Sequence, residues 1–317
     1  MIKIGGVSLD TSHPLGFAEE LEKSGIPMRY EYECNKGFRG DEETQWFLKR
    51  FQVKEATKIE DMADKVDIGF IQSCNWEKHL DLAMPFIKAG KPVFIDKPVI
   101  GSVSDAEKLR TLVKNGAVVY GASAMRYIKD ITDFLAKPVE ERGEVVSVFV
   151  EGGVNEFDYA IHSMEIASAI AQSKAIACKF VGAAKDAKGN PCESYFVEFE
   201  NGVTATYYCY HNTWCKGQVI VMTTKGPVFM ELDGFLAYHC MLKEVHKQLT
   251  EGKSILADVE TLINCSLAML CGKKSRDELN GKRVTLDELN ENDKFDGYAF
   301  EAAYAKAQTA KGKMYND

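Results

Sequence analysis

The sequence predicts an α/β protein with two domains: an N-terminal doubly wound parallel sheet and a C-terminal α+β domain with a mostly antiparallel open sheet. Three observations support this class. The chain has 317 residues, more than one core usually fills. Its first third alternates short apolar runs with amphipathic stretches, and longer alternating strands follow after about residue 125. We therefore expect domains at 1–122 and 123–317.

The first domain consists of repeated strand–helix units. The expected strands and helices lie at 2–7, 17–24, 28–34, 42–51, 68–72, 77–89, 93–95, 104–115 and 118–121. Strands that alternate with helices of this length favour a parallel sheet with right-handed crossovers. This is the arrangement of a Rossmann-like domain.

The second domain contains a hairpin signal. Two alternating segments, 195–200 and 203–208, are joined by Asn201-Gly202. Asn-Gly strongly predicts a two-residue turn, in which both positions take a positive φ. Further strands are expected at 218–223 and 228–231, and helices at 235–250 and 258–270.

Composition excludes several classes of partner. With 39 Lys+Arg against 47 Asp+Glu, the net charge of -8 opposes binding to nucleic acid or to an anionic membrane. No apolar run is long enough for a membrane span or a signal segment, so we expect a cytoplasmic protein. The nine cysteines form no CxxC pair and no zinc-type group, so we expect reduced thiols and no metal.

Asp96-Lys97-Pro98 follows directly on the apolar run 93–95. Ligands of open α/β sheets bind beyond the carboxyl ends of the strands, which makes Lys97 a candidate site residue. Pro98 restricts the residue before it and permits a cis peptide bond. The alternative is that Lys97 is a solvent-exposed charge on a loop, with no role in a site.

A second candidate lies in the segment 152–162. Asp158 and His162 stand four residues apart, so on a helix they share one face and reach one ligand together. An imidazole suits proton transfer because its pKa lies near neutral pH. The alternative is a surface pair or a packed core histidine.

Four segments together carry a resemblance to a known family: Ala89-Gly90-Lys91, Asp96-Lys97-Pro98, 121–127 and the late helix 251–274. They resemble the glucose-fructose oxidoreductase, inositol dehydrogenase and MocA family of dehydrogenases over nearly the whole chain, with Asp96 in place of the family's Glu. The resemblance implies hydride transfer between a nicotinamide cofactor and a secondary alcohol of a sugar, cyclitol or related polyol. In that reaction His162 takes the hydroxyl proton, Lys97 polarises the oxygen, and Asp158 orients substrate or base.

The resemblance also implies binding residues. On the cofactor side they are Ser8, Asp10, Thr11, Ser12, His13, Glu33, Asn75, Trp76, His79, Asp96 and Lys97, and on the substrate side Arg126, Tyr127, Asn155 and His211. Trp76 stands where the family has Asn, and Asn75 where it has Pro, so this match is imperfect. For His79 the alternative to cofactor binding is that it packs against the start of its helix. For Arg126 the alternative to substrate binding is a contact that holds the two domains together.

The phosphate loop departs from the glycine fingerprint. Ser8, Asp10 and His13 stand at the three glycine positions, and the Asp10 carboxylate repels a pyrophosphate unless it turns away, for example to cap the next helix. Glu33, or less favourably Glu31, is placed to accept from a ribose hydroxyl, which favours NAD and leaves NADP open. A solvent-facing strand edge is the alternative for these acids.

Other functions remain open. The altered loop favours a ligand-binding or regulatory protein that has lost turnover, and a lyase or epimerase with tightly bound NAD is a third possibility. The expected partner is a small polyol or sugar-like substrate. The aromatic strand 207–214 lines either the substrate pocket or a subunit interface. The resemblance implies contacts between subunits through the C-terminal sheet, so we also expect a homodimer or homotetramer.

Overall fold

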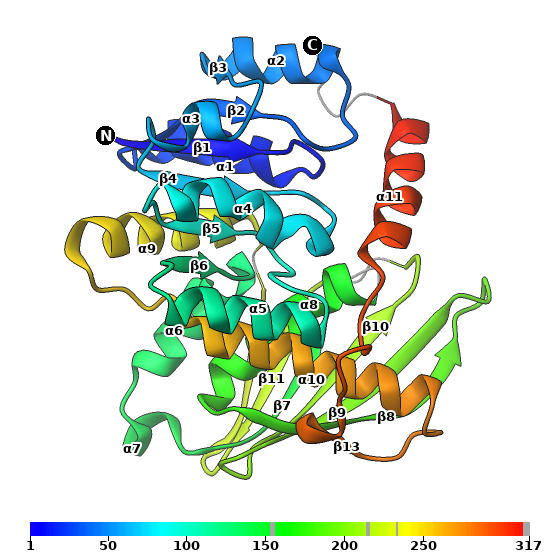
Figure 1. Cartoon of the computed structure of the whole chain (residues 1–317). Coiled ribbons are helices and arrows are strands. Elements are labelled where there is room, and N and C mark those ends of the chain that lie inside the picture. The colour runs from blue at the N-terminus through cyan, green and yellow to red at the C-terminus, as the bar shows by residue number, and fades with distance from the viewer. Residues whose placement is uncertain (153–155, 214–215, 233, 313–317) are drawn as a thin grey trace.

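A computed structural model describes residues 1–152, 156–213, 216–232 and 234–312. Two sheets organise the described chain (Figure 1). The first contains strands from residues 2–121 and the second strands from residues 145–285. The cartoon shows the first sheet with its helices in the upper half and the second sheet in the lower half.

The first sheet is a doubly wound parallel sheet. Its strands are β1 (Ile2–Val7), β2 (Met28–Cys34), β3 (Lys54–Glu55), β4 (Ile68–Ile71), β5 (Val93–Ile95) and β6 (Val119–Gly121). Their order is β3-β2-β1-β4-β5-β6, and every neighbouring pair is parallel, which confirms the predicted class. The strand order reverses beside β1, where such sheets bind ligands. Strands β4 and β5 are wholly buried, as expected of central parallel strands.

Along the sequence, the helices of this half alternate with its strands. They are α1 (His13–Ser24), α2 (Asp41–Phe51), α3 (Glu60–Ala63), η1 (Trp76–Lys78), α4 (His79–Lys88) and α5 (Val103–Lys114). Helix α1 begins four residues before the predicted position. Pro14 accounts for this, because proline has no N–H to lose in a first turn and its φ is already helical.

The second sheet is mostly antiparallel, as predicted. Its strands are β7 (Val145–Glu151), β8 (Ala175–Lys185), β9 (Pro191–Phe199), β10 (Thr204–Tyr210), β11 (Gln218–Thr223), β12 (Gly226–Glu231) and β13 (Val284–Thr285). Their order is β12-β11-β7-β10-β9-β8-β13, in which only the β7–β10 pair is parallel. Two long, largely buried helices pack on one face, α8 (Phe157–Ala171) and α10 (Val259–Asp277).

The remaining elements connect and flank these layers. They are η2 (Ala124–Tyr127), α6 (Lys129–Ala136), α7 (Val139–Arg142), η3 (Gly234–Leu236), α9 (Ala237–Glu251), η4 (Leu286–Glu288) and α11 (Gly297–Lys311). Helix α11, red in Figure 1, leaves the second sheet and runs along the side of the first sheet where the strands end. Among the described residues, no helix is both long and apolar enough to cross a membrane.

The hairpin between β9 and β10 forms at the predicted place with a different turn. Phe199 N–H donates to Val203 O at 2.9 Å, so three residues, 200–202, make the loop. Only Gly202 has a positive φ, at 85°, and Asn201 does not. The expected two-residue turn is therefore wrong. Asn201 has another role, because its Nδ2 donates to Ala171 O at the end of α8.

Candidate functional site

A cavity of about 1000 Å³ lies between α1 and the second sheet. Four segments that are distant in sequence contribute to its wall: the end of β5, the start of α1, helix α8 and helix α9. Its wall includes the titratable or hydroxyl side chains of Ser12, His13, Asp96, Tyr159, His162, Ser163 and Tyr238, and also those of Glu19, Glu20, Lys23, Glu151, Lys216 and Glu231. The carboxyl end of a parallel strand thus meets a helix from the second half of the chain.

His162 lies in the second turn of α8 and faces this cavity. Its Nδ1 and Ser123 Oγ are 2.5 Å apart, and Ser123 Oγ also accepts the N–H of Met125. Burial, reinforced by the nearby Lys97 and His13, lowers the pKa of His162 well below its ordinary value. The ring is therefore neutral at pH 7. When Nδ1 donates to Ser123, the lone pair of Nε2 is free to accept a proton.

Lys97 approaches the same helix. Its Nζ donates to the main-chain oxygen of Asp158 at 2.5 Å and lies 4.9 Å from the centre of the Tyr159 ring. That ring packs edge-on against the His162 ring, with their centres 5.6 Å apart. Lys97 and His162 thus share Tyr159 as a neighbour. The Lys97–Pro98 peptide bond is cis.

His13 and Asp96 form a second polar pair in the cavity wall. Nδ1 of His13 lies 2.5 Å from Asp96 Oδ2, and Asp96 Oδ1 accepts the N–H of Lys97. Burial alone would raise the pKa of Asp96, but His13 and Lys97 outweigh it and hold that pKa below its ordinary value. The His13 ring stacks on Phe17 and meets Tyr238 edge-on. His13 therefore points toward the end of β5.

The loop after β1 has an unexpected arrangement. The Asp10 carboxylate accepts N–H groups from Phe38 at 2.9 Å and Cys74 at 3.1 Å, and the hydroxyl of Ser73 at 3.3 Å. Asp10 therefore joins the loops that follow β1, β2 and β4. It does not cap α1, because the N-cap of that helix is Ser12, with no side-chain cap bond. The capping alternative is wrong.

The neighbouring side chains of this loop differ in role. Thr11 Oγ1 accepts the N–H of His13 at 3.2 Å, so this hydroxyl supports the first turn of α1. Ser8 is wholly buried with φ of 77°, and its Oγ has no hydrogen-bond partner in the described chain. It holds a backbone conformation that favours glycine, at the first glycine position of the fingerprint.

Ser8→Gly is expected to raise the free energy of unfolding by about 1 kcal/mol. The replacement relieves a left-handed backbone and removes a buried hydroxyl without a partner. Urea unfolding of both proteins measures the change. Ser12→Gly is the control, because Ser12 is exposed with φ of -74° and should lose stability. Equal losses in both variants would contradict strain at Ser8.

Glu33 is wholly buried, and neither carboxylate oxygen has a partner among the described residues. Its side chain packs against Gly6, where a Cβ would collide with it. Burial, with a further contribution from Asp10, raises the pKa of Glu33 from 4.5 to about 8. The solvent-facing alternative is therefore wrong for Glu33, and in this structure the carboxylate is closed off from any ribose.

The stability of the protein is expected to fall as pH rises from about 5 to about 8. Folded Glu33 keeps a proton that the unfolded chain releases above its ordinary pKa of 4.5. The slope from this group reaches about 1.4 kcal/mol per pH unit. Glu33→Gln should remove this component, which urea unfolding across that pH range measures.

Glu31→Gln provides the matched control. Lys54 and Arg29 bind the Glu31 carboxylate, with Lys54 the larger influence, and they lower its pKa. This carboxylate therefore stabilises the fold above pH 4.5, and its loss should cost stability there. The same pH slope in wild type and Glu33→Gln would refute the assignment.

Three residues assigned to the cofactor from the sequence make contacts within the protein. Asn75 caps η1, with its Oδ1 accepting Glu77 N–H. The indole of Trp76 donates to Phe295 O. The ring nitrogens of His79 lie 3.2 Å from Val99 O and 2.8 Å from Ser73 O. Trp76 and His79 are buried, so the packing alternative holds for His79.

Of the residues assigned to substrate, the three that the structure describes do not line the cavity beside His162. Arg126 and Tyr127 line a different hollow, where Arg126 donates to Glu165 O and Tyr127 OH accepts Ala257 N–H. His211 lies 3.4 Å from Glu193. Asn155 lies outside the described residues.

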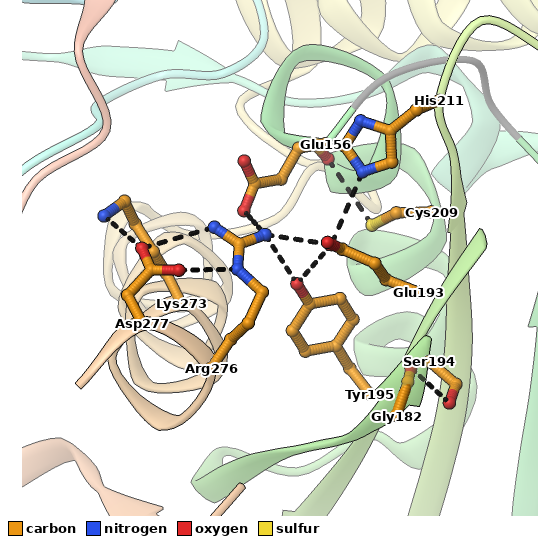
Figure 2. Close-up of polar contacts among 10 residues, drawn as sticks. All are labelled: Glu156, Gly182, Glu193, Ser194, Tyr195, Cys209, His211, Lys273, Arg276 and Asp277. Carbon is orange, nitrogen blue, oxygen red and sulfur yellow. Dashed lines mark hydrogen bonds and ion pairs between the residues drawn. The ribbon is translucent and has the colours of Figure 1, made fainter. Parts of the chain in front are cut away.

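Figure 2 shows the surroundings of His211. Glu193 joins it to Arg276, whose guanidinium also pairs with Glu156. The Glu193 carboxylate raises the pKa of His211. These residues belong to the cluster between β9, β10 and α10, and none of the residues in Figure 2 lines the cavity beside His162.

Sequence reasoning missed four residues around His162. They are Ser123, Tyr159, Glu165 and Tyr238. Glu165 stands three residues after His162, so helical spacing places it on the same side, and both its oxygens accept Ser123 N–H at 3.0 Å. Burial raises the pKa of Glu165 to about 7. Tyr238 belongs to no motif, and only the docking of α9 against α1 brings it here.

Comparison with known proteins agrees with this architecture. Residues 38–123 match the family described as "Oxidoreductase family, NAD-binding Rossmann fold". No curated protein matches the chain. Among solved structures, a probable dehydrogenase from Thermotoga maritima is similar, with a TM-score of 0.77 and 16% identity, over 91% of this chain and 100% of that one.

Two inositol dehydrogenases have the same fold. Scyllo-inositol dehydrogenase from Lactobacillus casei, solved with bound NAD(H) and scyllo-inositol, has a TM-score of 0.75 and 15% identity, over 91% of this chain and 100% of that one. Myo-inositol 2-dehydrogenase from Lactobacillus plantarum has a TM-score of 0.74 and 15% identity, over 90% of this chain and 99% of that one. The chain therefore shares the fold of these dehydrogenases, and its residues 38–123 match the NAD-binding Rossmann fold of an oxidoreductase family.

Proposed function

We propose that this protein is an NAD-linked dehydrogenase that oxidises a secondary alcohol of a small polyol. One observation carries the proposal: a neutral, oriented imidazole, His162, lies in a cavity beside the carboxyl ends of the parallel strands. Scyllo-inositol, which one structurally similar protein binds, indicates the kind of substrate. In this proposal residues 1–122 bind the cofactor and residues 123–317 bind the substrate.

The edge of the first sheet has groups that fit a dinucleotide. Helix α1 begins with Ser12 and His13 beside β1, so its first N–H groups are directed to that edge. Asn75 and Lys78, at the two ends of η1, already bind a carboxylate there, as they would a phosphate oxygen. The chemistry that a bound nicotinamide would supply is acceptance of the hydride.

His162 in the cavity wall and the neighbouring Lys97 account for the transfer of the proton. Nε2 of His162 accepts the proton of the substrate hydroxyl, and Ser123 holds the ring through Nδ1. The ammonium of Lys97 stabilises negative charge on the same oxygen once it turns from Asp158 O to the substrate. Asp158, one turn before His162 on α8, holds Lys97 near that position through its main-chain oxygen.

The test is formation of NADH from NAD with a panel of polyols and sugars, scyllo-inositol and myo-inositol included. Wild type should reduce NAD with at least one of them. Lys97→Met should abolish this turnover while keeping the unfolding midpoint. Absence of both NAD binding and NAD reduction at millimolar concentrations would overturn the proposal.

A second candidate is a lyase or epimerase, and the His13–Asp96 pair favours it. Such a reaction needs a second proton-transfer group, and an imidazole held by a carboxylate is suited to that task. Incubation of the same panel with NAD in heavy water distinguishes the two. Deuterium on substrate carbon without net NADH, lost in His13→Asn, would favour this candidate over the dehydrogenase.

We also propose that the open face of the second sheet forms a subunit interface. A cross-strand row on that face runs through Phe229, Ile220, Phe149, Thr206 and Phe196. Phe229 is 71% exposed, which is unusual for so large an apolar side chain. Light scattering should show a dimer or tetramer in wild type and a smaller species in Phe229→Glu. A wild-type monomer would refute this.

A further inference from the structure

Helix α11 covers the edge at which the proposed cofactor would bind. Its Tyr304 ring lies 6.0 Å from that of Phe38, which follows β2. Its Phe300 ring lies 5.1 Å from that of Trp76, which follows β4. Figure 1 shows the helix running along this side of the sheet. The loops that receive a dinucleotide in such folds are therefore in contact with the chain's own C-terminal helix.

Glu301 of α11 approaches the loop after β1. Carboxylate oxygens of Glu301 and Asp10 and the thiol of Cys74 all lie within 4.8 Å of one another. The Glu301 carboxylate accepts from Asn75 Nδ2 at 3.0 Å and from Lys78 Nζ at 2.7 Å. An amide and an ammonium are also the donors that a phosphate oxygen needs. Glu301 thus occupies an anion position at this edge.

Little holds α11 in place. Gly297 is its only buried residue in the described chain, and the inward Phe300, Glu301 and Tyr304 are only half-buried. Its many alanines favour a helix without tertiary support. The helix can therefore move off the edge without unfolding, at the cost of the Lys78–Glu301 ion pair, the hydrogen bonds Asn75–Glu301 and Gly297–Glu77, and a few ring contacts.

We propose that α11 is an internal competitor of the dinucleotide. In the docked state Glu301 occupies the place of a phosphate and Tyr304 that of the adenosine beside Phe38, and the cofactor binds only when α11 moves away. The inference rests on the proposed function, because it assumes that this edge binds NAD.

Calorimetric titration of the full chain with NAD tests the competition. The variant Glu301→Ala with Tyr304→Ala keeps the helix but removes both contacts, and should bind NAD roughly tenfold more tightly than wild type. Tyr304→Ala alone changes no charge and should tighten binding by a smaller factor. Lys306→Ala with Thr309→Ala is the matched control on the exposed face, and should bind as wild type does.

Hydrogen exchange gives a readout independent of affinity. Saturating NAD should accelerate exchange of the amides of 297–311 in wild type. Equal affinity in all variants with unchanged exchange would overturn the competition and leave the proposed function intact. Weaker NAD binding by the double variant would mean that α11 closes over the cofactor, and would also overturn the proposed competition. Absence of NAD binding by every variant would instead overturn the proposed function and the competition with it.

Discussion

Replacement of His162 by alanine is expected to lower kcat about a thousandfold on the polyol that wild type oxidises best. The variant loses the group that takes the hydroxyl proton, and general bases of this kind contribute about 10²- to 10⁴-fold. KM should change little, because the hydride acceptor and the rest of the cavity remain. Steady-state NADH formation measures both constants. An unchanged kcat would remove His162 from the mechanism.

The pH profile distinguishes a base from a merely structural histidine. Burial lowers the pKa of His162 well below 6.5, so the neutral form persists as pH falls through that value. The wild-type rate should therefore show no loss of activity near pH 6.5, where an ordinary imidazole would lose half of it. Ser123→Ala removes the partner of His162 Nδ1. It should shift the pH at which activity is lost on the acidic side of the profile, while NAD affinity stays unchanged.

The fold was predictable where local patterns decide it. The alternation of short apolar runs with helices predicts a parallel sheet, and β1, β2 and β5 form within the expected ranges. Turn geometry was less predictable, because the loop at 200–202 depends on the Asn201 contact with α8. The docking of α11 had no local signal at all, since its partners lie more than two hundred residues earlier.

The candidate site shows the same division. The position of Lys97 after a buried strand and the four-residue spacing of Asp158 and His162 follow from the strand and helix periods. The partners of buried polar groups do not. Glu33 was expected near a ribose and is enclosed against Gly6, while His211 was expected at the substrate and pairs with Glu193. Tertiary packing decides which of several polar neighbours each group meets.

Asp10→Ala is expected to lower the free energy of unfolding by about 3 kcal/mol. The carboxylate satisfies the buried N–H of Cys74, the buried hydroxyl of Ser73 and the part-buried N–H of Phe38, and each buried donor left without a partner costs about 1–3 kcal/mol. Burial raises the pKa of Asp10 despite these bonds, so its charge is itself costly to bury. Asp10→Asn removes that charge and keeps one acceptor, and should lose about half as much.

Urea unfolding followed by circular dichroism measures these losses, and Asp67→Ala is the matched control. Asp67 also accepts a main-chain N–H, from Lys3, but it is exposed, so water replaces the lost bond and the change should stay below about 0.5 kcal/mol. Gly37→Ala tests the same contact from the other side, because its Cβ would collide with the Asp10 carboxylate. If Asp10→Ala were no more costly than Asp67→Ala, Asp10 would not be what holds the three loops together.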